Sequence, residues 1–199
     1  MAKINRKYID KHWVVFILRG ILAGTFGFLL LFSKMEGIEN MDSVITEISV
    51  FLLLIGIIDS VSALYNSSKK HGWINSVIDA GIDVATAVVL LFFAKGDLAN
   101  SVVILSAYTI LSGIIDLFHG FVSTVDPTDR FIRILAGACG CVIGAVILNA
   151  GGFELATFAR FFGAYLLIVG VTSAIYGVHN RSQNIEDKIA RRQAKKTRK

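Results

Sequence analysis

Six apolar stretches, each about as long as a bilayer-spanning helix, constrain this chain more than any other feature of its sequence. They cover roughly residues 13–33, 43–65, 73–94, 99–122, 131–150 and 155–178. A helix needs about 20 mostly apolar residues to cross the hydrocarbon core of a membrane. Only 18% of the residues are charged, so little sequence remains for a separate soluble domain. We therefore expect an all-α membrane bundle of six transmembrane helices over residues 13–178.

The first apolar stretch follows a basic segment, as the apolar region of a secretory signal peptide also does. It runs from Trp13 to Phe32, which is longer than such a region, and its exit at Ser33-Lys34-Met35-Glu36 lacks the small residues of a cleavage site. We therefore expect this stretch to be retained as the first helix.

The basic residues are distributed unevenly along the chain. All but four of the 20 Lys and Arg residues lie in the segments 1–12, 69–70, 126–133 and 179–199. Because Lys and Arg near helix ends favour the cytoplasmic side, we predict a multi-pass protein of the inner or plasma membrane with both termini cytoplasmic. The basic carboxyl tail, 179–199, either binds anionic lipid, at about 1 kcal/mol per basic residue, or only enforces this orientation.

An internal repeat divides the six stretches into three pairs. The apolar runs of the second, fourth and sixth stretches contain Gly56, Gly113 and Gly170, which are equally spaced along the chain. In the first and third stretches, Trp13 and Trp73 correspond at nearly the same spacing. We expect three parallel two-helix repeats, related by an axis along the membrane normal. Their predicted ranges are 13–65, 73–122 and 131–178.

Glycines recur within these stretches at positions that favour close helix packing. Small residues let helix backbones approach each other where hydrophobic burial gives no driving force. No glycine-rich phosphate-binding pattern stands at a strand-to-helix turn, so packing is the expected role. The glycines assigned to packing are Gly20, Gly24, Gly27, Gly56, Gly113, Gly137, Gly140, Gly144 and Gly170.

Charged residues also occur inside the predicted helices, where each costs about 2.5–3.5 kcal/mol on insertion scales. At 1.5 Å per residue, most of them fall at one depth, about 9 Å from the cytoplasmic edge. Asp83 lies one helical turn further in than Asp79, on the same face. The predicted charge layer comprises Arg19, Asp59, Asp79, Asp83 and Asp116.

One arginine cannot neutralise four aspartates in a low-dielectric interior. Some of these aspartates must therefore be protonated or in contact with water. One interpretation is that Arg19 pairs with one aspartate and that the layer only sets helix register. The other is a proton- or cation-responsive site, since ionisable residues within a membrane are functional candidates.

The sequence favours neither catalysis nor a cofactor. Cys139 and Cys141 are two residues apart and point in different directions along a helix. None of the four histidines has the partner one turn away that makes a zinc helix convincing, so we expect no metal site. Catalysis needs polar groups gathered in a pocket, and only the charge layer gathers them, so we expect no enzyme.

Three features stand together in this chain: the stretch from Arg19 to Gly27 after a tryptophan, the recurring Gly-Ile-Ile-Asp, and three short two-helix repeats. In these features the chain resembles the HdeD-type acid-resistance membrane proteins and their short-repeat domain. It implies a six-helix inner-membrane protein of a bacterium or archaeon, with a role in acid resistance for the named member. The chain departs from the pattern at Asp79, at Ser173 and in its basic carboxyl tail.

Together, these features predict a non-enzymatic membrane protein linked to acid or envelope stress, acting through protonation of the charge layer. A transporter or channel for a small solute or ion is one alternative. A structural partner of other membrane proteins is the other. The partners expected are the lipid bilayer and either a second copy of the chain, in a homo-oligomer, or another membrane protein. No feature indicates nucleic-acid binding.

Overall fold

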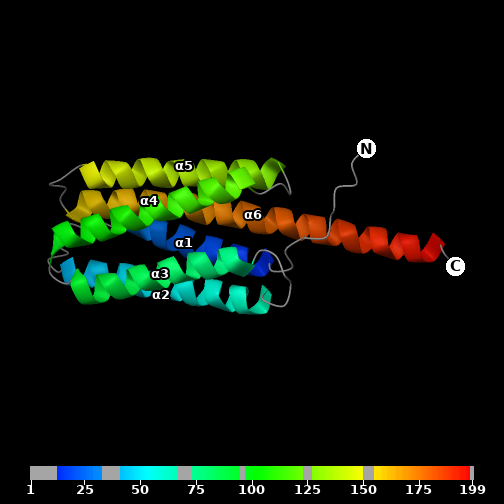
Figure 1. Cartoon of the computed structure of the whole chain (residues 1–199), viewed down its shortest axis with the longest axis horizontal. Helices are drawn as coiled ribbons and strands as arrows, with labels where there is room; N and C mark the ends of the chain where they lie inside the picture. The colour runs from blue at the N-terminus through cyan, green and yellow to red at the C-terminus, as the bar shows by residue number, and fades with distance from the viewer. Residues whose placement is uncertain are drawn as a thin grey trace.

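The computed structural model describes residues 13–32, 41–66, 73–94, 97–122, 127–149 and 155–197. Each segment forms one helix, and the helices lie side by side in an elongated bundle (Figure 1). Their bounds are α1 Trp13–Phe32, α2 Met41–Asn66, α3 Trp73–Phe93, α4 Leu98–Val122, α5 Pro127–Asn149 and α6 Leu155–Thr197. The predicted all-α fold with six helices is confirmed.

Five of these helices are long and apolar enough to cross a membrane: α1, α2, α4, α5 and α6. The sixth, α3, has 21 residues and packs along α2 within the same bundle. Leucine, valine and phenylalanine side chains are exposed along the bundle, as expected of a surface that faces lipid rather than water. The chain is a multi-pass membrane protein.

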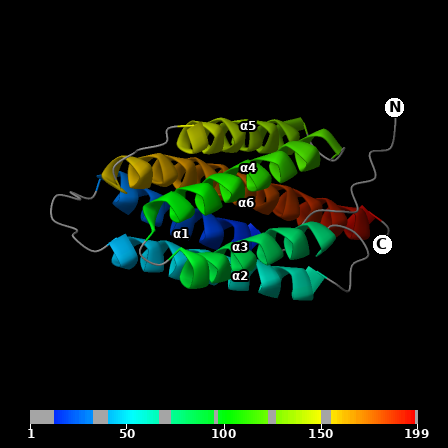
Figure 2. The same ribbon diagram turned by 60° about the vertical axis from the view of Figure 1, so that its left-hand side comes forward.

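The closest helix contacts are made between neighbouring repeats. The most extensive contacts join α2 with α3, α4 with α5, and α6 with α1. Contacts between α1 and α2, α3 and α4, or α5 and α6, the helices within each predicted repeat, are much sparser. Figure 2 shows the same arrangement from a second direction. The repeat in sequence and the packed helix pair are therefore offset by one helix.

The glycines explain which helices pair closely. A Cβ on Gly113 would come within 2.7 Å of the Gly137 carbonyl oxygen, between α4 and α5. A Cβ on Gly20 would come within 2.7 Å of the Gly170 carbonyl oxygen, between α1 and α6. At Gly56 it would meet Val84 of α3. Side chains at these positions would push the backbones apart, so each pair depends on its glycines.

The other glycines assigned to packing lie at the same interfaces, with one difference. Gly27 faces α6, and Gly140 and Gly144 face α4. A Cβ added at any of the three would come within 3.2 Å of an atom of the neighbouring helix. Gly24 has nothing within 4 Å of its own Cβ position, although Gly170 packs directly against its backbone.

Burial repeats along the chain with the spacing found in the sequence. In α1 and α3 the positions that correspond when Trp13 is aligned with Trp73 are buried alike, for example Leu30 and Leu90. The three even-numbered helices likewise share buried positions, and the equally spaced glycines at 56, 113 and 170 are all buried. The repeats are therefore equivalent in packing as well as in sequence.

We call the end of the bundle from which α6 extends the tail end. Away from the tail end, the interior is apolar and tightly filled. Ile48, Leu90, Leu105, Phe158 and Phe162 are all fully buried there. This apolar core closes the far half of the bundle.

Two helix boundaries differ from those expected. α5 begins at Pro127, earlier than the predicted start at residue 131, because proline is well suited to the first turn of a helix. α6 does not end near residue 178 but continues to Thr197, since no glycine or proline follows Gly177. Residues 179–197 are thus a helical extension of α6 rather than a separate tail. The amino tail, 1–12, lies outside the described residues, as do the basic side chains beyond Arg181.

Candidate functional site

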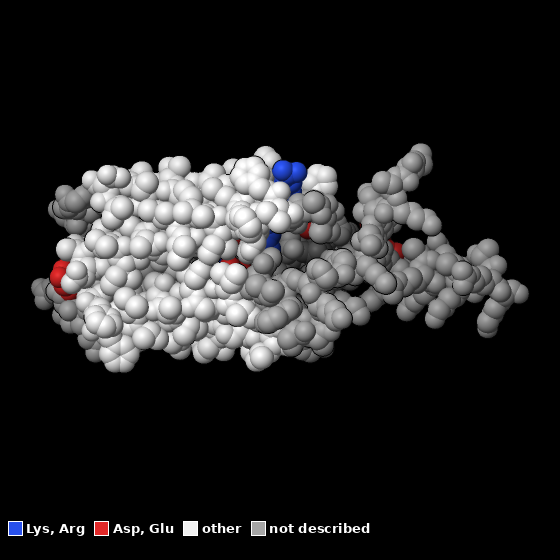
Figure 3. Space-filling view, viewed as in Figure 1, with Lys and Arg blue, Asp and Glu red and all other residues white. Residues whose placement is uncertain are grey.

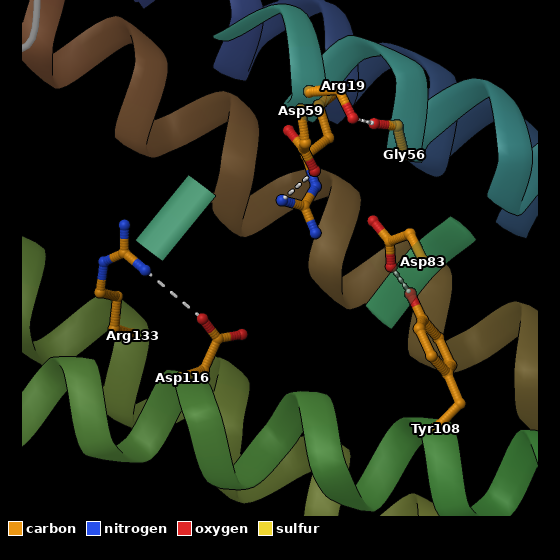
Figure 4. Close-up of polar contacts among 8 residues, drawn as sticks. Arg19, Gly56, Asp59, Asp83, Tyr108, Asp116 and Arg133 are labelled. Carbon is orange, nitrogen blue, oxygen red and sulfur yellow. Dashed lines mark hydrogen bonds and ion pairs between the residues drawn. The ribbon is translucent and has the colours of Figure 1, made fainter. Parts of the chain in front are cut away.

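Charged side chains from five helices meet near the tail end of the bundle. Arg19 lies six residues after the start of α1, Asp79 six after the start of α3, and Arg133 six after the start of α5. Asp59 and Asp116 lie the same distance, within one residue, from the ends of α2 and α4. Because neighbouring helices run in opposite directions, these positions fall at about one depth in the bundle. Figure 4 shows most of the cluster.

The strongest contact in the cluster joins α1 with α2. A guanidinium nitrogen of Arg19 lies 2.8 Å from a carboxylate oxygen of Asp59. The two side chains are only 15% and 6% exposed. An ion pair buried to this extent is costly to break, because either partner alone is left as an uncompensated charge.

A second, looser ion pair joins α4 with α5. Arg133 lies 3.5 Å from Asp116, and both side chains keep about a quarter of their surface exposed. The Arg133 guanidinium also lies over the ring of Tyr176 in α6, 5.0 Å from its centroid. A cation in this position is stabilised by the ring face as well as by the carboxylate. Arg133 therefore links three helices.

Asp83 is the most deeply placed carboxyl group of the cluster. It is 3% exposed, and one of its oxygens accepts a hydrogen bond of 2.8 Å from the Tyr108 hydroxyl. Its other oxygen is buried with no hydrogen-bond partner among the described residues. Tyr108 packs edge-on against Tyr165, the equivalent residue of the next repeat. Arg19, the cation that acts on this carboxyl group, is already paired with Asp59, so Asp83 is a natural position for a proton.

A cavity of about 50 Å³ opens beside the two ion pairs. Its polar lining includes Arg19, Asp79, Asp116, Arg133 and Tyr176. A water molecule needs only about 10–15 Å³ of such volume, so the cavity has room for several. Figure 3 shows acidic and basic atoms close together towards the tail end, with uncharged side chains over most of the rest of this face.

The structure brings together the residues predicted for the charge layer. Asp79 and Asp116 line the cavity, as does Arg19, which also pairs with Asp59. Asp83 lies one turn beyond Asp79 and is in contact with Tyr108 instead.

Sequence reasoning missed Arg133 and Tyr108. From the sequence, Arg133 belongs to the basic segment 126–133, and a helix that begins at residue 131 places it only two residues from the helix start, too shallow for the charge layer. Counted from Pro127, it has the same position in its helix as Arg19 in α1. The layer therefore contains two arginines rather than one. With all groups ionised, the cluster still has four negative charges against two positive ones.

Residues 78–149 and 135–190 both match the short repeat of unknown function, DUF308. The starts of the two matches are separated by the same interval as Gly56 and Gly113. The two matches confirm that the chain contains an internal repeat, which the family model finds twice. Neither a curated protein nor a solved structure matches the chain. Because the two matches together span more than half of its residues, the chain belongs to the DUF308 short-repeat family.

Proposed function

We propose that this chain is a non-enzymatic membrane protein of the HdeD type that contributes to tolerance of acid or envelope stress. Its charge cluster takes up protons when the pH falls. The observation that carries the proposal is the cavity, large enough for water, next to a cluster with more carboxylates than cations.

The charge balance supports proton uptake. Arg19 and Arg133 each form an ion pair with one of the four carboxylates. Asp83 accepts a hydrogen bond from Tyr108 and shares the charge of Arg19 with Asp59. An uncompensated buried charge is unfavourable, and binding a proton removes it. The cavity has room for water beside Asp79 and Asp116, which line it.

The shape of the interior favours a sensor over a passive channel. The cavity lies towards the tail end, whereas the far half of the bundle is filled by fully buried side chains such as Leu90, Leu105 and Phe158. Protons that enter the cavity therefore meet an apolar barrier. Protonation in this arrangement changes the ion pairs that join α1 with α2 and α4 with α5, and so alters helix packing.

The test replaces the cluster carboxyl groups one at a time. Asp83→Asn and Asp116→Asn keep side-chain size but remove the titrating group. Asp97→Asn is the matched control, because Asp97 caps the start of α4 at the far end of the bundle and asparagine caps equally well. Each variant is compared for infrared titration of its carboxyl bands and for cell survival in acid, at equal membrane levels.

We expect Asp83→Asn and Asp116→Asn to lose part of the infrared titration and to lower survival, with Asp97→Asn unchanged. Wild-type titration and survival in both cluster variants would contradict the proposal. Proton or solute flux in vesicles of the purified wild type would favour the transporter alternative instead. A partner that co-purifies in the absence of any flux or titration would favour a structural role.

A further inference from the structure

Beyond Arg181, which stacks on Trp13 of α1, α6 leaves the bundle with no described element beside it. α6 has 43 residues, and its apolar span ends at His179. At 1.5 Å per residue the whole helix is about 65 Å long, roughly twice the hydrocarbon thickness. Figure 1 shows the extension continuing straight along the axis of α6. Helices in proteins gain most of their stability from packing. Because no described element packs against this extension, we look for its partner in another molecule.

An exposed stripe runs along α6 from the bundle into the extension. Its members alternate at spacings of four and three residues, which is the heptad pattern of a coiled-coil seam. Five of the six are apolar and each of those is between 47% and 58% exposed. The stripe comprises Val171, Ile175, Val178, Ser182, Ile185 and Ile189.

This stripe is not the face that packs inside the bundle. Gly170 and Gly177 lie against the backbone of α1, whereas Thr172 and Tyr176 line the cavity. The stripe lies between these two faces and points outwards. It is therefore available to another molecule while the bundle stays intact.

The residues beside the seam carry complementary charges. In a parallel coiled coil, the residue just before one seam position faces the residue five positions later on the partner helix. Here that rule sets Arg181 opposite Glu186 of a second copy, and by symmetry makes the same pair twice. Both residues are exposed, and Arg181 is held at the edge of the seam by stacking on Trp13 at 4.9 Å. Two copies in one membrane have the same orientation, so their α6 helices run parallel.

We propose that this stripe is the interface of a homodimer, formed by the α6 helices of two copies of this chain. The resulting coiled coil begins in the membrane and continues through the extension beyond it. The inference does not depend on the proton-related function of the charge cluster.

The direct test is disulfide crosslinking of full-length protein in native membranes. Cys139 and Cys141 are first replaced by alanine, and single cysteines are then introduced as Ile185→Cys or Ile189→Cys. Asp187→Cys is the matched control, since position 187 lies opposite the seam in the heptad. We expect oxidation to link the seam variants into dimers and to leave the control monomeric. Equal crosslinking of all three would overturn the proposal.

A charge reversal tests the register independently. Glu186→Lys places two lysines against two arginines and should weaken association about tenfold, while the added change Arg181→Glu should restore it. Dimer fraction is measured between two differently tagged copies in mild detergent. Residue 186 lies outside the bundle, so the thermal unfolding midpoint of the bundle should be the same in Glu186→Lys as in the wild type. An unchanged dimer fraction in Glu186→Lys would contradict a parallel α6 interface. So would a wild-type protein whose two differently tagged copies do not purify together.

Discussion

At the scale of single residues, the unusual feature of this protein is the cost of the charges that it buries. Arg19 and Asp59 are held in an ion pair of 2.8 Å, with little access to solvent. Such a pair contributes little net stability over a well-packed apolar pair, but the loss of either partner is severe. Asp83 accepts a neighbouring hydrogen bond from Tyr108 and shares the charge of Arg19 with Asp59. The cluster is therefore sensitive to changes in the charge of single groups.

The Arg19–Asp59 pair gives a prediction for stability. Arg19→Met should lower the free energy of unfolding by about 3–5 kcal/mol, because Asp59 is left as a buried carboxylate without its cation. The double variant Arg19→Met with Asp59→Leu should recover most of this loss, since no unpaired charge remains. Thermal unfolding in detergent measures both. A double variant no more stable than Arg19→Met would show that the ion pair is not the origin of the loss.

At the scale of helices, pairing is decided by where glycines allow backbones to touch. Gly170 of α6 packs on the backbone of Gly24 in α1, while the Cβ position of Gly24 itself is open. Gly113 and Gly137 make the corresponding contact between α4 and α5. In α3 the position that corresponds to Gly20 of α1 is Ala80. The α2–α3 pair still packs closely there through Gly56 of α2.

This asymmetry predicts opposite effects for two substitutions at one interface. Gly170→Ala should cost about 1–3 kcal/mol, because the new methyl group meets the backbone of α1, which cannot move aside easily. Gly24→Ala should be neutral or stabilising by up to about 1 kcal/mol, since the position is open and alanine favours the helix. Thermal unfolding midpoints of the two variants provide the comparison. Equal destabilisation by both would contradict the predicted dependence on Gly170.

At the scale of the whole molecule, the three close pairs form a ring that the last helix closes. α2 pairs with α3, α4 with α5, and α6 returns to α1. The charge cluster lies towards the tail end of this ring and the apolar core towards the far end. The two ends of the bundle therefore differ in polarity, which matters for the direction from which protons arrive.

The uneven distribution of basic residues predicts that the tail end faces the cytoplasm. In a background without Cys139 and Cys141, a membrane-impermeant maleimide should label Ala99→Cys on intact cells. Glu186→Cys should be labelled only after the membrane is permeabilised. Both residues are exposed, so access depends on the side of the membrane. The reverse pattern of labelling would show the opposite orientation.

The sequence alone determined the fold class, the number of helices and the internal repeat. Apolar stretches of about 20 residues leave few alternatives to membrane helices, and equally spaced glycines identify the repeat. It also predicted the positions of Arg19, Asp59, Asp79, Asp83 and Asp116 near one depth, because depth follows directly from distance along a helix.

Only the tertiary structure decided which helices pair, and which groups complete the charge cluster. Spacing along a helix gives depth but not the neighbour across an interface, so the offset pairs and the contact of Asp83 with Tyr108 could not be predicted. The place of Arg133 in the cluster depended on the start of α5 at Pro127, which puts this residue six positions into the helix rather than two. Helix ends are set by local capping and by packing together, which is why sequence patterns locate them less well than helix centres.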